Sequence, residues 1–180
     1  MSQSFKIPKI TLGGNVFGWT IDEKESFKIL DFSVQNGLNF IDTADVYSLW
    51  HEGNKGGESE TIIGNWIKKR GKRDDLLIAT KLGWDLGNGK KGLSKKYMKE
   101  AINASLKRLN TDYVDLYISH RDDEETPLEE TMEAFNELIK EGKVREIGSS
   151  NIYAKKTKET NDYAKKNGLK GYIRIQTQYN

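Results

Sequence analysis

The sequence predicts an α/β fold in which short parallel strands alternate with helices. Three observations support this prediction. Short apolar runs recur along the 180 residues, and the segments between them carry apolar residues at helical spacing. Glycines and residues typical of helix caps mark where those segments begin and end. Since such an alternation forms a parallel sheet with helical crossovers, we expect one domain over residues 1–180.

The first predicted strand covers residues 10–12 and 16–19, which flank two glycines. Asp22 then begins a helix, and Glu25 completes a capping box three residues later. A second strand follows at residues 38–41. A polar, glycine-rich loop leads to the next helix, whose buried side is expected to consist of Ile62, Ile63, Trp66 and Ile67.

Residues 76–80 form the third predicted strand, and Ser94 caps the helix after it. The fourth strand is expected at residues 113–118. Thr126 and Pro127 open the next helix, with the proline at the first helical position, where its missing N–H group costs nothing.

Glu129 completes a second capping box in that helix. Strands at residues 144–147 and 172–177 then flank a lysine-rich helix at residues 153–167. About six strands and five helices of this kind fit either a doubly wound open sheet or an incomplete (β/α)₈ barrel. No G-x-G-x-x-G pattern follows the first strand, which removes the main support for a dinucleotide-binding doubly wound sheet.

The composition limits the classes of partner. The 29 basic and 27 acidic side chains leave a net charge of +2, which is too small to indicate a nucleic-acid or membrane surface. The absence of cysteine excludes disulfides, thiolate metal sites and a cysteine nucleophile, and no other metal-binding cluster is apparent. No segment reaches the roughly 18–20 apolar residues that span a bilayer. We therefore expect a cytoplasmic protein with no nucleic-acid or membrane partner.

Three of the predicted strands lead into side chains that can exchange protons or hydrogen bonds. These are Asp42 after the second strand, Lys81 after the third and His120 after the fourth. In a parallel barrel all three lie at the carboxyl-terminal rim, where active sites form. Tyr47 lies in the loop just beyond Asp42 and can fold back over that rim. The four residues are therefore candidates for one catalytic group.

This group suggests a proton donor. A free tyrosine has a pKa of about 10, and we expect the ammonium of Lys81 to lower the pKa of Tyr47. Asp42 can pair with Lys81 and keep it charged despite burial. His120 can donate a hydrogen bond to a substrate oxygen or to Tyr47. Proton donation to a carbonyl that receives a hydride fits these four residues best.

Each candidate also has a structural interpretation when it is taken alone, such as a turn cap for Asp42 or a buried, hydrogen-bonded histidine for His120. Their joint placement at successive strand ends favours the catalytic interpretation. Three tryptophans, Trp19, Trp50 and Trp84, fall on loops at the same rim. They can line a substrate pocket or pack in the core, and the sequence leaves both interpretations open.

Several segments together resemble the aldo-keto reductases, which are (β/α)₈ barrels of the TIM type that reduce aldehydes and ketones with a nicotinamide cofactor. FIDTADVY, IATKLG and YVDLYISH carry the resemblance. It implies that Asp42, Tyr47, Lys81 and His120 are the family's four catalytic residues, with Tyr47 as the proton donor. The glycine-containing loop at residues 50–57 resembles bacterial members near the potassium-channel β-subunit branch.

The resemblance also implies a cofactor site. EGKVREIGSSN and IQTQYN are similar to segments that bind the nicotinamide carboxamide, which points to Ser150, Asn151 and Gln176. Gly18 and Trp19 correspond to positions that border the cofactor, beside Asp42. The family makes NADPH the default cofactor, with NADH as the alternative, and a small carbonyl compound the substrate.

The sequence is short for this family, because a closed eight-stranded barrel needs about 250 residues. The seventh and eighth strand–helix units are therefore expected to be absent from residues 1–180. We favour a reductase fragment, truncated at its C-terminus and with impaired activity. Two alternatives remain: a chain that associates with itself or with a complementing C-terminal part, and a non-catalytic cofactor sensor or assembly subunit.

Overall fold

The computed structural model describes residues 8–177, which contain six strands and five helices. The strands are β1 (Leu12–Gly13), β2 (Phe40–Asp42), β3 (Leu77–Leu82), β4 (Val114–Ser119), β5 (Val144–Ser150) and β6 (Arg174–Gln176). The helices are α1 (Glu23–Gln35), α2 (Glu58–Arg70), α3 (Lys95–Leu109), α4 (Leu128–Lys140) and α5 (Ala154–Lys166). The predicted alternation of strands and helices is confirmed.

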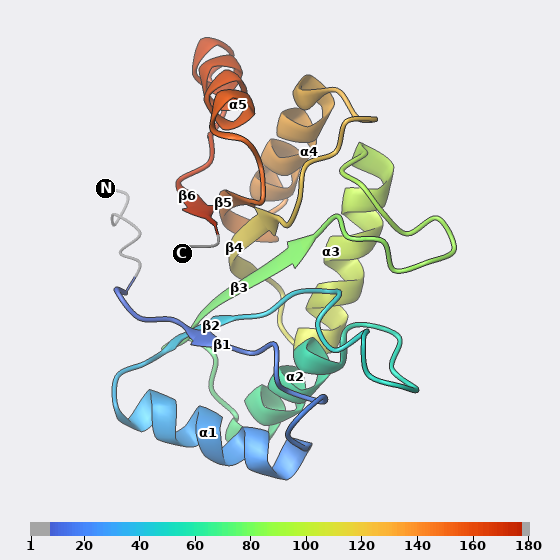
Figure 1. The fold of residues 1–180 in the computed structure, drawn as a ribbon. Helices are drawn as coiled ribbons and strands as arrows, with labels where there is room; N and C mark the ends of the chain where they lie inside the picture. The colour runs from blue at the N-terminus through green and yellow to red at the C-terminus, as the bar shows by residue number, and fades with distance from the viewer. Residues whose placement is uncertain (1–7, 178–180) are drawn as a thin grey trace.

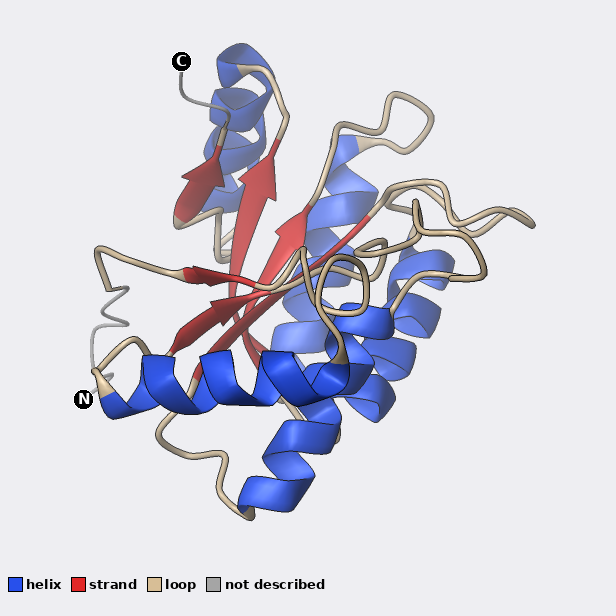
Figure 2. Ribbon diagram, turned by 60° about the horizontal axis from the view of Figure 1, so that its bottom comes forward, coloured by secondary structure: helices blue, strands red, loops and turns tan. Residues whose placement is uncertain are grey.

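The strands form one parallel sheet in the order β1-β2-β3-β4-β5-β6. Each strand pairs with the next strand along the chain, so the order never reverses as it does in a doubly wound sheet. The helices form an arc around the outside of the curved sheet (Figure 1) and leave its inner face uncovered (Figure 2). The arrangement is that of an incomplete (β/α)₈ barrel.

Two of the three predicted N-terminal helix caps form as expected. The Asp22 carboxylate accepts a hydrogen bond from the backbone N–H of Glu25 at 2.8 Å, and the Ser94 hydroxyl accepts one from Tyr97 at 3.4 Å. A complete capping box would also have the Glu25 side chain accept a hydrogen bond from the backbone N–H of Asp22. That part of the prediction is wrong, because the side chain of Glu25 pairs with Lys28 instead.

The predictions for the start of α4 and for the first strand also need correction. Pro127 is the residue before the helix rather than its first member, and no side chain caps this end. The Thr126 hydroxyl donates instead to Asp123 at 2.7 Å, so the second capping box does not form. The first strand is only two residues long, and residues 16–21 form turns with a single bridge between Phe17 and Ile21.

Most of the hydrophobic core lies between the sheet and its helices. The buried side predicted for α2 is confirmed, because Ile62, Ile63, Trp66 and Ile67 are all at most 8% exposed. Gly64 allows α2 to approach α3 closely, since an added Cβ would overlap the carbonyl oxygen of Arg108. The inner face of the sheet holds a much smaller cluster, made of Phe40, Ala79, Leu116 and Ile118.

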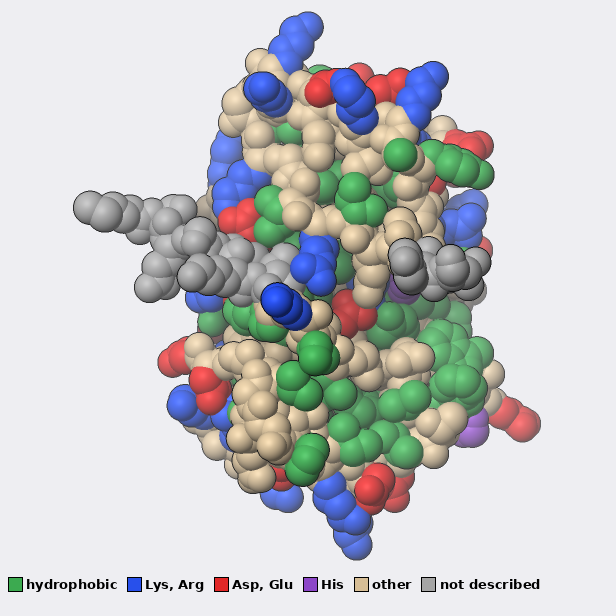
Figure 3. All heavy atoms as spheres, turned by 60° about the vertical axis from the view of Figure 1, so that its left-hand side comes forward, with side chains coloured by type: hydrophobic (Ala, Val, Ile, Leu, Met, Phe, Trp, Pro, Cys, Tyr) green, Lys and Arg blue, Asp and Glu red, His purple; other side chains and the backbone are tan. Residues whose placement is uncertain are grey.

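The sheet is open among the described residues, because β1 and β6 each pair on one side only. Ile173 and Ile175 are 48% and 53% exposed next to this opening, and Figure 3 views the open side, where hydrophobic side chains reach the surface. One contact crosses the opening: the side-chain amide of Gln176 lies 3.4 Å from the Asp42 carboxylate. No helix within residues 8–177 is long and apolar enough to cross a bilayer.

Candidate active site

The structure brings three of the predicted catalytic residues into direct contact. Asp42 is the last residue of β2, and Lys81 lies near the end of the neighbouring strand β3. The Lys81 ammonium donates hydrogen bonds to Asp42 Oδ2 at 2.7 Å, to the hydroxyl oxygen of Tyr47 at 2.7 Å and to the carbonyl of Thr43 at 2.9 Å. The side chains therefore form one connected unit at the carboxyl-terminal rim.

Burial dominates the electrostatics of this unit. Lys81 is 1% exposed, and its burial lowers its pKa from the usual value, while the Asp42 carboxylate acts in the opposite direction. Glu60, and Asp45 when it is ionised, also favour the ammonium form. The lysine thus depends on carboxylates on more than one side to remain charged.

Tyr47 departs from the expectation in one respect. Burial and then the Asp42 carboxylate raise the pKa of its phenol, whereas the sequence predicted a lowered pKa. The physical reason is that a phenolate here would lose water and face a carboxylate 3.4 Å away. Tyr47 therefore holds its proton, as a donor must before reaction, and the Lys81 ammonium lies beside the oxygen that would become negative.

His120 follows β4 and is 9% exposed. Burial, with a smaller effect of the Lys81 charge, lowers the pKa of its imidazole to about 3, so the ring is neutral near pH 7. Its ring packs edge-on against Tyr47, with centroids 5.8 Å apart, and makes no hydrogen bond to it. Within the described chain His120 Nδ1 has no hydrogen-bond partner. The neutral ring can therefore form a hydrogen bond with a bound molecule.

The residues predicted to bind cofactor lie on two sides of the same rim. Ser150 and Gln176 end β5 and β6 and face each other in register. The Asn151 amide donates to the carbonyl of His120 at 2.9 Å and to the Ser150 hydroxyl at 3.1 Å. Gly18 and Trp19 lie beyond β1, and Gly18 adopts a left-handed conformation with φ of +76°.

The three tryptophans do not pack in the core, because Trp19, Trp50 and Trp84 are all between 39% and 49% exposed. The Trp19 and Trp50 rings meet edge-on at 5.5 Å, and Trp50 also approaches Tyr47. On the other side, the Trp84 ring lies 5.9 Å from that of His120. Aromatic rings thus flank the candidate catalytic residues on both sides.

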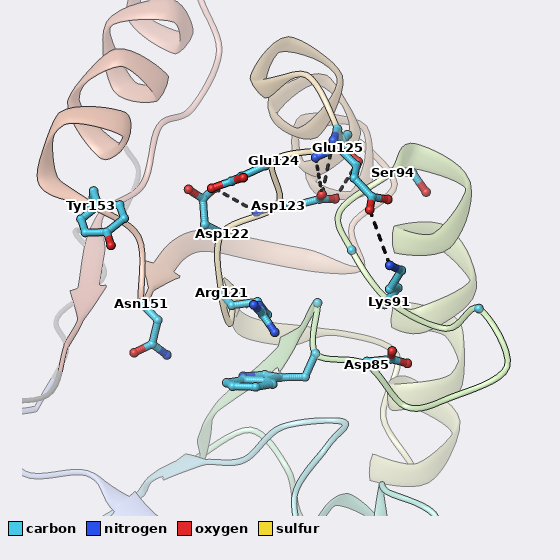
Figure 4. Close-up of a pocket in the computed structure, with 15 residues that line it drawn as sticks. Asp85, Lys91, Ser94, Arg121, Asp122, Asp123, Glu124, Glu125, Asn151 and Tyr153 are labelled. Atoms are coloured by element: carbon cyan, nitrogen blue, oxygen red, sulfur yellow. Dashed lines mark hydrogen bonds and ion pairs between the residues drawn. The ribbon is translucent and has the colours of Figure 1, made fainter.

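A pocket of about 880 Å³ opens beside His120, between the loops that follow β3, β4 and β5 (Figure 4). Trp84, Arg121 and Asn151 line it, together with several carboxylates. The sequence reasoning did not single out Arg121. The available signal was its position directly after His120, where its backbone emerges from the same strand end.

A second group was also missed. Behind Lys81, the buried Glu60 accepts hydrogen bonds from Thr80 and from Arg108 at 2.6 Å. Asp45 is 1% exposed, and burial raises its pKa well above the usual range. Asp45 belongs to the FIDTADVY segment, so the signal was an additional acid directly after a buried strand.

A model of the Aldo/keto reductase family matches residues 9–180. The chain belongs to the aldo/keto reductase family. The resemblance inferred from the sequence motifs is therefore confirmed, and the incomplete barrel is that of an aldo/keto reductase.

Relatives of this aldo/keto reductase chain include proteins of Bacillus subtilis and Arabidopsis thaliana. It is 35% identical to the uncharacterized oxidoreductase YrpG of Bacillus subtilis, over 97% of this chain and 55% of the relative. It is 39% identical to a probable voltage-gated potassium channel subunit beta of Arabidopsis thaliana, over 97% and 52%. It is 41% identical to the aldo-keto reductase YhdN of Bacillus subtilis, over 78% and 41%. The chain thus spans about half the length of these relatives.

Proposed function

We propose that this chain carries the proton-donating part of an oxidoreductase that reduces aldehydes and ketones to alcohols with NADPH. The observation that carries the proposal is the position of Lys81 Nζ, 2.7 Å from both the Tyr47 hydroxyl and the Asp42 carboxylate. A buried ammonium held between a phenol and a carboxylate is a costly arrangement that proton transfer at Tyr47 would explain.

In the proposed step, Tyr47 gives its hydroxyl proton to the oxygen of the substrate carbonyl. The O–H bond of the phenol breaks as the new O–H bond of the alcohol forms, and the phenolate left behind lies next to the Lys81 ammonium. Asp42 positions that ammonium. The neutral imidazole of His120 donates a hydrogen bond to the same carbonyl oxygen and orients it.

The rim suits a nicotinamide ring, whose carboxamide needs both donors and acceptors. The Asn151 and Gln176 amides are exposed there beside the Ser150 hydroxyl, and the buried hydroxyl of Ser149 has no partner within residues 8–177. We propose that Ser150, Asn151 and Gln176 hold the carboxamide, with Gly18 and Trp19 at its border. The bound cofactor supplies the hydride. NADPH is the proposed form, and NADH is the alternative.

An isotope experiment tests the proposal even when turnover is slow. The purified protein is incubated with 4-nitrobenzaldehyde and NADPH that carries deuterium in the transferable position. Deuterated 4-nitrobenzyl alcohol, detected by mass spectrometry above the level of a protein-free control, is the expected product. Its absence at saturating cofactor would reject the catalytic proposal.

We also propose that residues 1–180 alone bind NADPH weakly, because the described sheet is open at β1 and β6. Self-association or a complementing C-terminal part would cover those edges. Quenching of tryptophan fluorescence measures the affinity, and sedimentation measures the state of association. Micromolar binding by the monomer would contradict this part of the proposal.

A second candidate function is that of a cofactor sensor or assembly subunit without catalysis. It is favoured by the plant relatives that are named as probable potassium channel beta subunits, from Arabidopsis thaliana and Oryza sativa. NADPH binding without deuterated alcohol in the same experiment would support this candidate, and brisk turnover would exclude it.

A further inference from the structure

Arg121 occupies an unusual position beside the candidate catalytic residues. It follows His120 directly, and its guanidinium carbon lies 4.7 Å from the centre of the Trp84 ring, which in turn lies 5.9 Å from the ring of His120. Arg121 and Asn151 both line the pocket (Figure 4), and Trp84 lines it as well. The Arg121 guanidinium makes no hydrogen bond or ion pair with any of residues 8–177.

None of the carboxylates that line the pocket pairs with this guanidinium, and most of them contact other groups. Asp122 pairs with Lys156. Asp123 accepts hydrogen bonds from the backbone of Leu93 and from Thr126, both at 2.7 Å. The remaining acidic side chains that line the pocket are Asp85, Glu124 and Glu125. Of these, Glu125 lies 3.6 Å from Lys91, and Asp85 accepts a hydrogen bond from the backbone of Gly87.

The cation–π contact with Trp84 restrains the guanidinium, whose planar fork can bind a carboxylate with two parallel hydrogen bonds. We propose that Arg121 determines specificity by binding a carboxylate on the substrate, so that the preferred substrates are short oxo acids whose carbonyl group lies between Tyr47 and His120. The identity of the reacting group, an aldehyde or ketone, rests on the proposed carbonyl reduction. The carboxylate subsite is inferred from Arg121 and the pocket alone.

The acidic wall narrows the class of anion further. A single carboxylate adds one negative charge, which the Arg121 guanidinium can neutralise. A phosphate or a dianion would bring additional negative charge toward the side chains of Asp85, Glu124 and Glu125, with which it would repel. The substrate class is therefore a monocarboxylate in which a short spacer, alongside Trp84, separates the carboxylate from the aldehyde or ketone.

Three aldehydes of similar shape test the subsite by binding alone. They are 4-carboxybenzaldehyde, the neutral 4-formylbenzamide and the cationic 4-trimethylammoniobenzaldehyde, each titrated into the 180-residue protein by ligand-observed NMR. We expect the carboxylate to bind about tenfold more tightly than the amide, the scale of one charge-assisted hydrogen-bonded pair. Equal affinities, a preference for the cation, or no binding of any probe would overturn the proposal.

Variants show which cation is responsible. Arg121→Gln should make the carboxylate and the amide bind equally, and Arg121→Lys should keep part of the preference because it retains the charge without the planar fork. Lys91→Gln is the matched control, since it removes one positive charge from the same pocket without touching Trp84. A preference that survives in Arg121→Gln but disappears in Lys91→Gln would move the subsite away from Arg121.

The binding and isotope experiments test the carboxylate subsite and the proposed reduction independently. Selective binding of 4-carboxybenzaldehyde without deuterated alcohol would retain the carboxylate subsite and reject the proposed reduction. Deuterated alcohol from the amide and the carboxylate at equal rates and with equal affinities would retain the reduction and reject the subsite. Circular dichroism of Arg121→Gln confirms that a lost preference does not come from unfolding.

Discussion

The Nζ atom of Lys81 lies 2.7 Å from the hydroxyl oxygen of Tyr47 at the end of the β2–β3 pair, where the lysine is buried and the tyrosine is half-buried. The Asp42 carboxylate completes the contact on the other side of the ammonium. Because each member of this group fixes the charge or position of the others, the effects of their substitutions should not add.

Replacing Tyr47 by phenylalanine removes the proposed proton donor and little else. We expect the rate of alcohol formation to fall by roughly 10²–10⁴-fold, the usual contribution of a positioned acid. Affinity for NADPH should change little, and fluorescence quenching measures it. The control is Tyr163→Phe, which removes an exposed hydroxyl that donates a hydrogen bond to Glu133, away from the candidate active site. An unchanged rate in Tyr47→Phe would remove Tyr47 from this role.

Replacing Lys81 by methionine leaves the Asp42 carboxylate without its counterion. Lys81 is 1% exposed, so we expect a loss of about 3–5 kcal/mol in the free energy of unfolding, the range seen when one partner of a buried pair is removed. Adding Asp42→Asn to Lys81→Met should restore part of the loss. Urea unfolding of the single and double variants measures this coupling, and additive losses would show that the pair is energetically unimportant.

His120 should make stability depend on pH in the acid range. Its pKa is lowered to about 3 in the folded protein, whereas an unfolded histidine takes up its proton near pH 6.5. The unfolded chain therefore binds the proton first as the pH falls, and the folded state loses stability across that window. Between about pH 7 and pH 4 this contribution amounts to about 3 kcal/mol.

The variant His120→Asn isolates that contribution from the other titrating groups. Its free energy of unfolding should fall less steeply with decreasing pH than that of the parent, and the difference between the two slopes reports the proton taken up by His120. Parallel slopes would mean that the imidazole is not kept neutral by its surroundings.

Gly64→Ala should destabilise the protein although alanine usually favours a helix. Alanine gains roughly 1 kcal/mol over glycine in an exposed helix, but here its Cβ would overlap the Arg108 carbonyl oxygen and push α2 from α3. We expect a net loss of about 1–3 kcal/mol, the usual cost of overpacking. Thermal unfolding measures it, and Lys69→Ala on the same helix is the control. A stabilised Gly64→Ala would show that the two helices separate freely.

The sequence placed Asp42, Lys81 and His120 correctly at one rim because parallel strands deliver their carboxyl ends to the same edge of a sheet. That inference requires only the order of the strands and the identity of the residue at each strand end, both of which can be read from the sequence. The direction of the Tyr47 pKa shift depends on burial and on the distance to Asp42, which only the packed structure provides. The sequence predicted that the Lys81 ammonium would lower the pKa of Tyr47, but burial has the larger effect and raises it.

The start of a helix was harder to predict where a loop residue binds the side chain that would otherwise cap the helix. Thr126 had the pattern of a helix cap, but its hydroxyl bonds to Asp123, an interaction that depends on how the preceding loop folds. Arg121 was overlooked for a related reason. A charged residue after a strand usually faces solvent, and its stacking on Trp84 depends on the loop after β3, a separate part of the sequence.

The contact between Gln176 and Asp42 joins residues that lie 134 positions apart, whereas every strand pair links neighbours in the chain. During synthesis each strand–helix unit can therefore dock on the one already made. The acid at the end of β2, however, meets its amide partner only after β6 has emerged from the ribosome. The side-chain amide signals of Gln176 in an NMR spectrum should accordingly report the docking of β6 on the sheet.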